Sequence, residues 1–140
     1  MDETTRWSTI ARWLRAPRTE DLDEIRGLTR ATIAARRASP EDGCGDDLYA
    51  LCFLLYLVGE PEDVVLIDDA KHLNMDTGCM IDRFLLTMRR DRRTMLGAVA
   101  AVAADADRPW LERDVTAAFD APHDGDPATF ERALYAYFDP

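Results

Sequence analysis

Apolar side chains recur along most of this chain at intervals of three and four residues, the spacing that places them on one face of an α-helix. The alternation of apolar and polar residues that is typical of a strand is absent over any useful length. We therefore expect an all-α protein, either a compact bundle or a short solenoid-like stack of about eight antiparallel helices. The predicted helices span residues 4–16, 21–37, 46–58, 61–72, 76–88, 95–106, 110–121 and 128–138.

The longest apolar run covers residues 48–58 and lies in the stretch around which the rest of the chain is expected to pack. A run of this length is too short to cross a bilayer, which needs roughly 20 apolar residues. It instead predicts a helix buried among other helices. Asp46 and Asp47 are predicted to cap the start of this helix, and Gly59 is predicted to end it in the left-handed conformation.

The helix predicted over residues 76–88 begins with Asp76 as its N-cap. This prediction places Asp82 in the helix interior, where aspartate is a poor helix former. Asp82 is therefore expected either to face water or to pair with Lys71 or an arginine. The apolar face of this helix is predicted to consist of Met80, Ile81, Phe84, Leu85 and Met88.

Two other helices have clear buried stripes, one near each end of the chain. In the helix over residues 21–37 the predicted stripe consists of Leu22, Ile25, Thr29, Thr32 and Ile33. In the last helix the predicted inward residues are Phe130, Leu134 and Tyr137.

A single domain is expected over residues 1–140, since this is an ordinary length for one hydrophobic core. It divides into an N-terminal helical pair (1–40), a central three-helix unit (46–88) and a C-terminal three-helix unit (94–138). The last two units echo each other at a spacing of 48 to 49 residues, which is consistent with either a three-helix repeat or ordinary helix–loop chemistry.

Charge is unevenly distributed along the chain, whose net charge is −10. Residues 41–82 contain eleven acidic residues and one lysine, which accounts for the whole imbalance. Such a field repels nucleic acids and membrane surfaces and attracts basic partners. The alternative interpretation is that these carboxylates are solvated helix faces and caps. The arginine-rich residues 89–93 are interpreted as helix ends rather than as a nucleic-acid site.

The N-terminal residues show no apolar segment typical of a signal peptide, so a cytoplasmic location is the default expectation. The three cysteines, Cys44, Cys52 and Cys79, have spacings that fit neither a disulfide framework nor a CxxC metal site.

Candidate chemistry centres on His72, which lies four residues after Asp68 and four before Asp76. An Asp–His pair at this spacing on a helix is able to hold a metal or polarise a base. A metal site needs three or four convergent ligands, and no metal-binding motif accompanies this pair. The structural interpretation is that His72 complements the dipole of a helix C-terminus. A Cys79–His72 pair is a further catalytic alternative, and it lacks an orienting group. We expect no catalytic residue, metal ligand or cofactor.

The segment from Asp63 to Leu86 reads D-V-x-L-I-x-x-A-K, then D-T-x-C-x-I-D-x-x-L-L. It resembles a motif in an uncharacterised family of small helical bacterial proteins, which resemble components encoded near toxin and immunity genes. The resemblance covers about a sixth of the chain and implies no activity. The residues that carry it are Asp63, Ala70, Lys71, Asp76, Thr77 and Asp82.

The first functional hypothesis is a non-enzymatic interaction module, in one version an immunity-type or antitoxin-like protein, that binds a basic protein through the acidic surface of residues 41–82. Two alternatives stay open: a small metal-dependent hydrolase that uses Asp68, His72 and Asp76, and a structural scaffold or homo-oligomeric subunit. The binding residues predicted by the first hypothesis are Glu60, Glu62, Asp63, Asp68 and Asp69. The residues assigned to a structural motif are Lys71, Asp76, Thr77 and Asp82.

Overall fold

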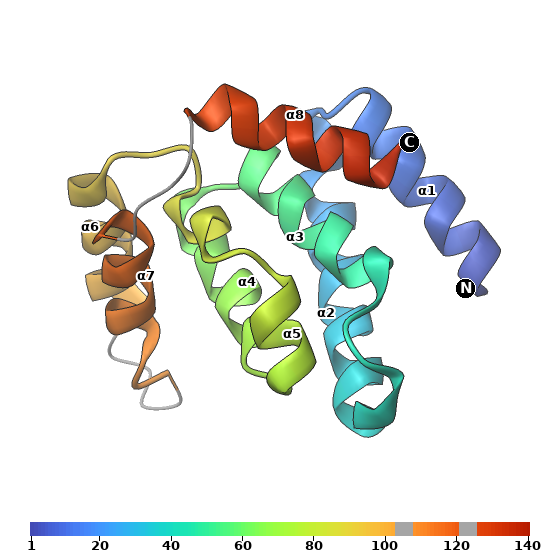
Figure 1. Ribbon diagram of the computed structural model, residues 1–140, viewed down its shortest axis with the longest axis horizontal. Helices are drawn as coiled ribbons and strands as arrows, with labels where there is room; N and C mark the ends of the chain where they lie inside the picture. The colour runs from blue at the N-terminus through green and yellow to red at the C-terminus, as the bar shows by residue number, and fades with distance from the viewer. Residues whose placement is uncertain (103–107, 121–125) are drawn as a thin grey trace.

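The computed structural model describes residues 1–102, 108–120 and 126–140, and this part of the chain contains eight α-helices, four short 3₁₀ helices and no strand (Figure 1). The all-α prediction is therefore confirmed, while the antiparallel order of the helices stays a prediction. The α-helices are α1 (Glu3–Arg15), α2 (Leu22–Ala38), α3 (Gly45–Val58), α4 (Val64–Lys71), α5 (Met75–Met80), α6 (Arg92–Val102), α7 (Leu111–Asp120) and α8 (Pro127–Phe138). The 3₁₀ helices are η1 (Thr19–Asp21), η2 (Pro40–Asp42), η3 (Pro61–Asp63) and η4 (Arg83–Thr87).

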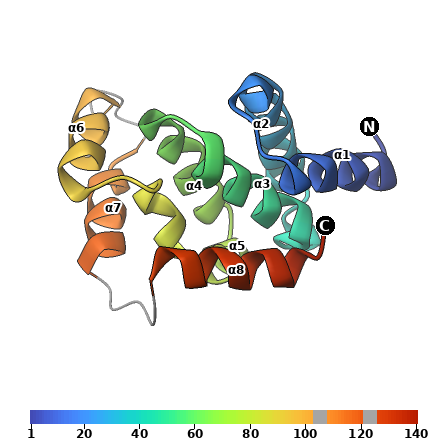
Figure 2. The ribbon, with the colours of Figure 1, turned by 90° about the horizontal axis from the view of Figure 1, so that it is seen from above.

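Helix α3 forms the centre of the molecule, as its apolar run predicts. Every side chain from Leu48 to Tyr56 is buried. Helices α1, α2 and α4 pack against α3, and α8 crosses it on another side (Figures 1 and 2). The α8 contact is aromatic, because the ring of Phe138 lies 5.4 Å from that of Tyr49 and 6.1 Å from that of Phe53. No helix in the described ranges is long and apolar enough to cross a membrane.

Helix α2 buries the predicted stripe along its full length. Leu22, Ile25 and Ile33 are buried apolar residues, and Thr29 and Thr32 are buried with them. The two threonines satisfy their hydroxyls within the helix, since each donates a hydrogen bond to the carbonyl four residues earlier. This local bonding explains how a polar residue can occupy an inward position without a partner on another helix.

Helices α6 and α7 form a pair at the end of the molecule away from α1 (Figures 1 and 2). Helix α7 packs against η4 and α4 through buried Leu111, Val115 and Ala118. The helix predicted over residues 95–106 begins earlier, at Arg92, and its predicted end lies outside the described residues. Residues 121–125, which include His123, also lie outside the described residues.

The prediction of one continuous helix over residues 76–88 is wrong. Helix α5 ends at Met80, Ile81 and Asp82 are extended, and the chain continues as the 3₁₀ helix η4. Asp82 causes part of this break, because its side chain accepts the N–H of Phe84 at 2.8 Å and so caps η4. Asp82 is therefore an N-cap and not an interior helix residue, in agreement with the preference of aspartate for caps.

Several predicted helix ends also differ from the structure. Asn74, rather than Asp76, caps α5 in a reciprocal bond with Thr77. Cys44, rather than Asp46 or Asp47, is the N-cap residue of α3, although Asp47 accepts the N–H of Leu48 in its first turn at 2.8 Å. Gly59 has φ −75° rather than a left-handed conformation. Glycine is needed there for another reason, because a Cβ would lie 2.3 Å from the carbonyl oxygen of Leu55.

The inward face of α8 is shifted from the prediction at its C-terminal end. Phe130 and Leu134 are buried as predicted, but Tyr137 is 53% exposed and Phe138 is buried in its place. Phe130, Leu134 and Phe138 are four residues apart, so the stripe continues at one spacing instead of turning back to position 137.

Candidate functional site

The five acids predicted to form one binding surface lie in different environments. Asp63 is 5% exposed and forms two charged hydrogen bonds with Arg26, at 2.7 and 2.8 Å. Asp68 is 2% exposed, and Asp69 forms an ion pair with Arg108 at 3.1 Å. Only Glu60 and Glu62 are exposed. The expectation of one surface that contains all five carboxylates is therefore corrected, because internal arginines and burial remove Asp63 and Asp68 from it.

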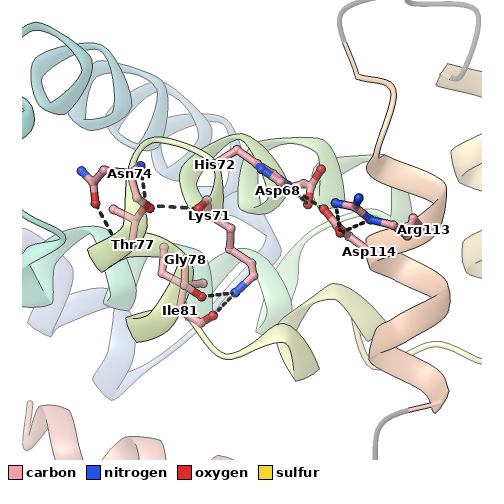
Figure 3. A network of polar contacts seen from close by, with 9 residues as sticks. All are labelled: Asp68, Lys71, His72, Asn74, Thr77, Gly78, Ile81, Arg113 and Asp114. Atoms are coloured by element: carbon pink, nitrogen blue, oxygen red, sulfur yellow. Dashed lines mark hydrogen bonds and ion pairs between the residues drawn. The ribbon is translucent and has the colours of Figure 1, made fainter.

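The residues assigned to a structural motif bind helix ends, as Figure 3 shows for Lys71 and Thr77. Lys71 directs its ammonium group to the carbonyl oxygens of Gly78, at 3.0 Å, and Ile81. The hydroxyl of Thr77 donates toward the carbonyl of Lys71 and completes the cap of α5. These bonds satisfy backbone groups that a six-residue helix leaves unpaired. Burial lowers the pKa of Lys71, although nearby carboxylates such as Asp82 oppose this shift.

Asp76 belongs to the same motif but points to a different part of the fold. Its Oδ2 accepts the backbone N–H of Cys44 at 2.6 Å. It also lies so close to Gly43 that a Cβ there would be 2.9 Å away. Asp76 therefore joins α5 to the turn before α3, and it is not assembled with His72 and Asp68. The ligand set predicted for the hydrolase alternative is corrected accordingly.

Asp114 takes the position beside His72 that the sequence had assigned to Asp76 (Figure 3). Oδ2 of Asp114 lies 2.6 Å from Nε2 of His72, and Oδ1 of Asp68 lies 3.6 Å from the same nitrogen. Asp68 and His72 lie four residues apart on α4 and its C-cap, so they share one face. Asp114 comes from α7, 42 residues after His72, and no local spacing in the sequence could have indicated it.

The two carboxylates of this cluster have opposite pKa shifts. Burial, followed by the hydrogen bond and the charge of Asp114, raises the pKa of Asp68 to about 8. Burial also opposes ionisation of Asp114, but hydrogen bonds from His72 and Asp68 hold its pKa below the usual value. The two carboxyl groups therefore titrate as an interacting pair, in which Asp68 is the more easily protonated member.

A second concentration of carboxylates lies where the turn before α3 meets α5. Glu41, Asp42, Asp46 and Asp76 are all exposed there, and we call this set the acidic corner. Asp42 and Asp46 line one pocket, and Asp76 contacts the intervening turn through Cys44. Asp46 accepts a hydrogen bond from the hydroxyl of Tyr137 at 2.7 Å, which is the main cause of a raised Tyr137 pKa.

No family model, no curated protein and no solved structure matches this chain. The resemblance of residues 63–86 to a toxin-associated bacterial family therefore stays a prediction. Two arrangements of side chains bear on function, the acidic corner and the Asp68–His72–Asp114 cluster.

The other groups considered as candidates from the sequence are Cys79 and the arginines of residues 89–93. Cys79 is exposed, and neither a hydrogen bond nor an ion pair joins it to His72 in the described structure. Among the arginines of residues 89–93, Arg89 pairs with Glu131 and Arg92 pairs with Asp120. Arg90 donates to the carbonyls of Met88 and Gly59. These contacts support the interpretation of that run as helix ends.

Proposed function

We propose that this protein is an interaction module that binds a basic partner protein at the acidic corner (Glu41, Asp42, Asp46 and Asp76). The observation that carries the proposal is the convergence of four exposed carboxylates from η2, α3 and α5 on one region of the surface. Within the described ranges, none of the four forms an ion pair with an arginine or lysine. Their charge is therefore available to a partner.

The neighbouring acid Asp47 differs from these four carboxylates, because it is paired with arginines. It is bound by Arg6 at 2.9 Å and by Arg36 at 2.6 Å, and its side chain is only 13% exposed. The two arginines are thus bound to one internal acid, and the acidic corner keeps a net negative charge. Unpaired surface charge of one sign speeds the encounter with a partner of opposite charge.

Apolar groups beside the acidic corner complete a surface of the kind that proteins bind. Met75 is 85% exposed and precedes Asp76, and Tyr137 is 53% exposed and bonds to Asp46. Methionine and tyrosine are enriched in interface cores, and tyrosine is common among the residues that dominate binding energy. A basic partner with an apolar patch would thus find charge and contact area together.

The other exposed acids of residues 41–82 form a separate group. Glu60 and Glu62 follow the C-terminus of α3, whereas Asp46 lies in its first turn. A helix of 14 residues separates the two groups by about 21 Å. The proposed binding surface is therefore the acidic corner and not the whole 41–82 segment.

Two charge-reversal variants with the same change in net charge test this proposal. Glu41→Lys/Asp42→Lys alters the acidic corner, and Glu24→Lys/Glu62→Lys alters exposed acids elsewhere. Proteins cross-linked to each variant in its native host should include a basic partner that the first variant loses and the second keeps. The association rate of that partner should fall as ionic strength rises. Equal capture by both variants, or a rate indifferent to salt, would refute the proposal.

A further inference from the structure

Three potential ligand atoms converge at the contact between α4 and α7. One potential ligand atom from each of Asp68, His72 and Asp114 lies within 4.8 Å of the other two. A four-residue spacing on α4 supplies the first two, and a separate helix supplies the third. Zinc–ligand bonds of about 2.1 Å in a tetrahedral site place the ligand atoms roughly 3.4 Å apart. The 3.6 Å between Asp68 Oδ1 and His72 Nε2 is close to this spacing, and the 2.6 Å contact between Asp114 Oδ2 and His72 Nε2 has to open.

The Oδ1 atom of Asp68 is a second, independent observation that points to a ligand at this cluster. This atom is buried and accepts no hydrogen bond from any protein group, and the whole residue is only 2% exposed. Buried polar atoms without a partner are rare because each one costs free energy. Oδ1 faces the His72 nitrogen at a distance too long for a hydrogen bond. A cation between them would satisfy it.

Neighbouring groups hold the three side chains in place. Arg113 contacts the other carboxylate oxygen of Asp114, Oδ1, at 3.3 Å and leaves Oδ2 directed to His72. The His72 ring packs against Trp110, with ring centroids 4.9 Å apart. Outer groups of this kind orient metal ligands and maintain affinity. Lys71, the nearest cation on α4, has its ammonium group bound by backbone carbonyls (Figure 3).

Two clefts border the cluster, and one of them is lined by His72 and Asp114. The other cleft, of about 230 Å³, is lined by Asp68, His72 and Trp110 among others. The His72 side chain is 34% exposed, whereas that of Asp68 is 2% exposed. An ion could therefore enter from the cleft and keep a water molecule as a further ligand, as zinc sites with three protein ligands do.

We infer that Asp68, His72 and Asp114 bind one divalent transition-metal ion, with Zn²⁺ as the best-fitting ion. One imidazole with two carboxylates suits ions of intermediate softness, since Mg²⁺ and Ca²⁺ prefer oxygen ligands alone. The ion would bridge α4 and α7, which contact each other here through His72 and Asp114. This inference is independent of the proposed interaction at the acidic corner, which lies around the start of α3.

The test uses untagged, chelator-treated protein with Cys79→Ser as the background, because an exposed thiol also binds Zn²⁺. Calorimetric titration with ZnCl₂ should show one site per chain. His72→Ala and Asp114→Asn should each weaken binding at least tenfold, as loss of a ligand requires. The matched control is His123→Ala, which removes the other of the two histidines in the sequence. The Zn²⁺ affinity of this variant should be unchanged. Titration with MgCl₂ should show far weaker binding.

Structural and spectroscopic readouts make the result decisive even where one variant is less stable. Far-UV circular dichroism establishes that each variant is folded before titration. Co²⁺ in place of Zn²⁺ should give visible absorption bands of a low-coordinate site, and these should vanish in His72→Ala. The inference is wrong if Zn²⁺ does not bind at millimolar concentration, or if His72→Ala and His123→Ala bind it equally. If His72→Ala loses Zn²⁺ binding but still captures the basic partner, the metal site and the proposed binding surface are two independent properties of the protein.

Discussion

Arg26 and Asp63 form a bidentate ion pair between α2 and η3, with N–O distances of 2.7 and 2.8 Å. Asp63 is 37 residues from Arg26 in the chain and also accepts the N–H of Glu60 at 2.8 Å. One carboxylate thus fixes the α3–α4 turn and attaches it to the N-terminal part of the fold. This explains why an acid expected at the binding surface is buried.

Replacement of Asp63 by alanine should lower the free energy of unfolding by about 3–5 kcal/mol, the usual cost of leaving one member of a buried pair without its partner. Asp23→Ala is the matched control, because Asp23 also contacts Arg26 but has a side chain that is 96% exposed. The control should change stability by less than about 0.5 kcal/mol. Urea denaturation measures both, and equal effects would show that the Arg26–Asp63 pair is not a structural link.

Lys71→Met should destabilise the segment from α5 to η4, because the carbonyls of Gly78 and Ile81 lose their donor. The expected loss is about 1–3 kcal/mol, mainly for the carbonyl of buried Ile81, which is left unsatisfied, since Gly78 is exposed to water. Amide hydrogen exchange should accelerate over residues 75–88 more than elsewhere. Arg83→Met removes an exposed cation from the same segment and serves as the control. Unchanged exchange in Lys71→Met would contradict a structural role for the only lysine.

The packing of α8 predicts opposite outcomes for two adjacent aromatic residues. Phe138→Ala should cost about 3–5 kcal/mol, since its ring is buried against Tyr49 and Phe53. Tyr137→Ala should cost less than about 1 kcal/mol, because Tyr137 is largely exposed. Thermal or urea unfolding measures the difference. A larger loss for Tyr137→Ala would mean that the helix is rotated from the described register.

Cysteine reactivity should distinguish the three thiols. Cys44 and Cys52 are buried, and burial raises the pKa of Cys44 to about 12 and that of Cys52 further still. Since only the thiolate reacts, iodoacetamide at pH 8 should modify Cys79 alone in the folded protein. Mass spectrometry should show one modified site under native conditions and three in urea. Native modification of Cys44 would indicate that the turn before α3 opens.

Acid titration should report the cap of α8. The side chain of Asp126 accepts the N–H of Thr129, which lowers its pKa from the usual 3.8. Because the pKa is depressed in the folded state, the cap stabilises α8 above about pH 4 and is lost as the pH falls through the lower folded value. Carbon-detected NMR of the Asp126 carboxyl should give a midpoint below that of urea-unfolded protein. An identical midpoint would show that the cap is absent.

Local patterns in the sequence were sufficient for the fold class and for the most buried faces. The run from Leu48 to Tyr56 is apolar on every side, and burial among other helices is the only favourable environment for it in water. The stripe of α2 is also correct at every predicted position. These predictions succeed because burial of apolar surface depends on spacing within one element.

Helix ends and the α8 face were predicted less well, because competing partners decide them. Asn74 and Asp76 are both good caps, and the structure uses Asn74 because Asp76 is bound to Cys44. Asp82 was placed inside a helix because the apolar spacing continues past it, but its own bond to the backbone stops that helix. Propensity alone cannot rank such alternatives.

The sequence by itself determined that this chain is helical, which segments lie in its core, and that residues 41–82 carry the excess negative charge. Only the tertiary structure decided which of those carboxylates are neutralised, because Arg26 and Arg6 reach Asp63 and Asp47 from distant helices. It also brought Asp114 to His72 and left Asp76 elsewhere. The physical reason is that apolar periodicity acts within one helix, whereas charge pairing and ligand geometry depend on how separate helices are placed in space.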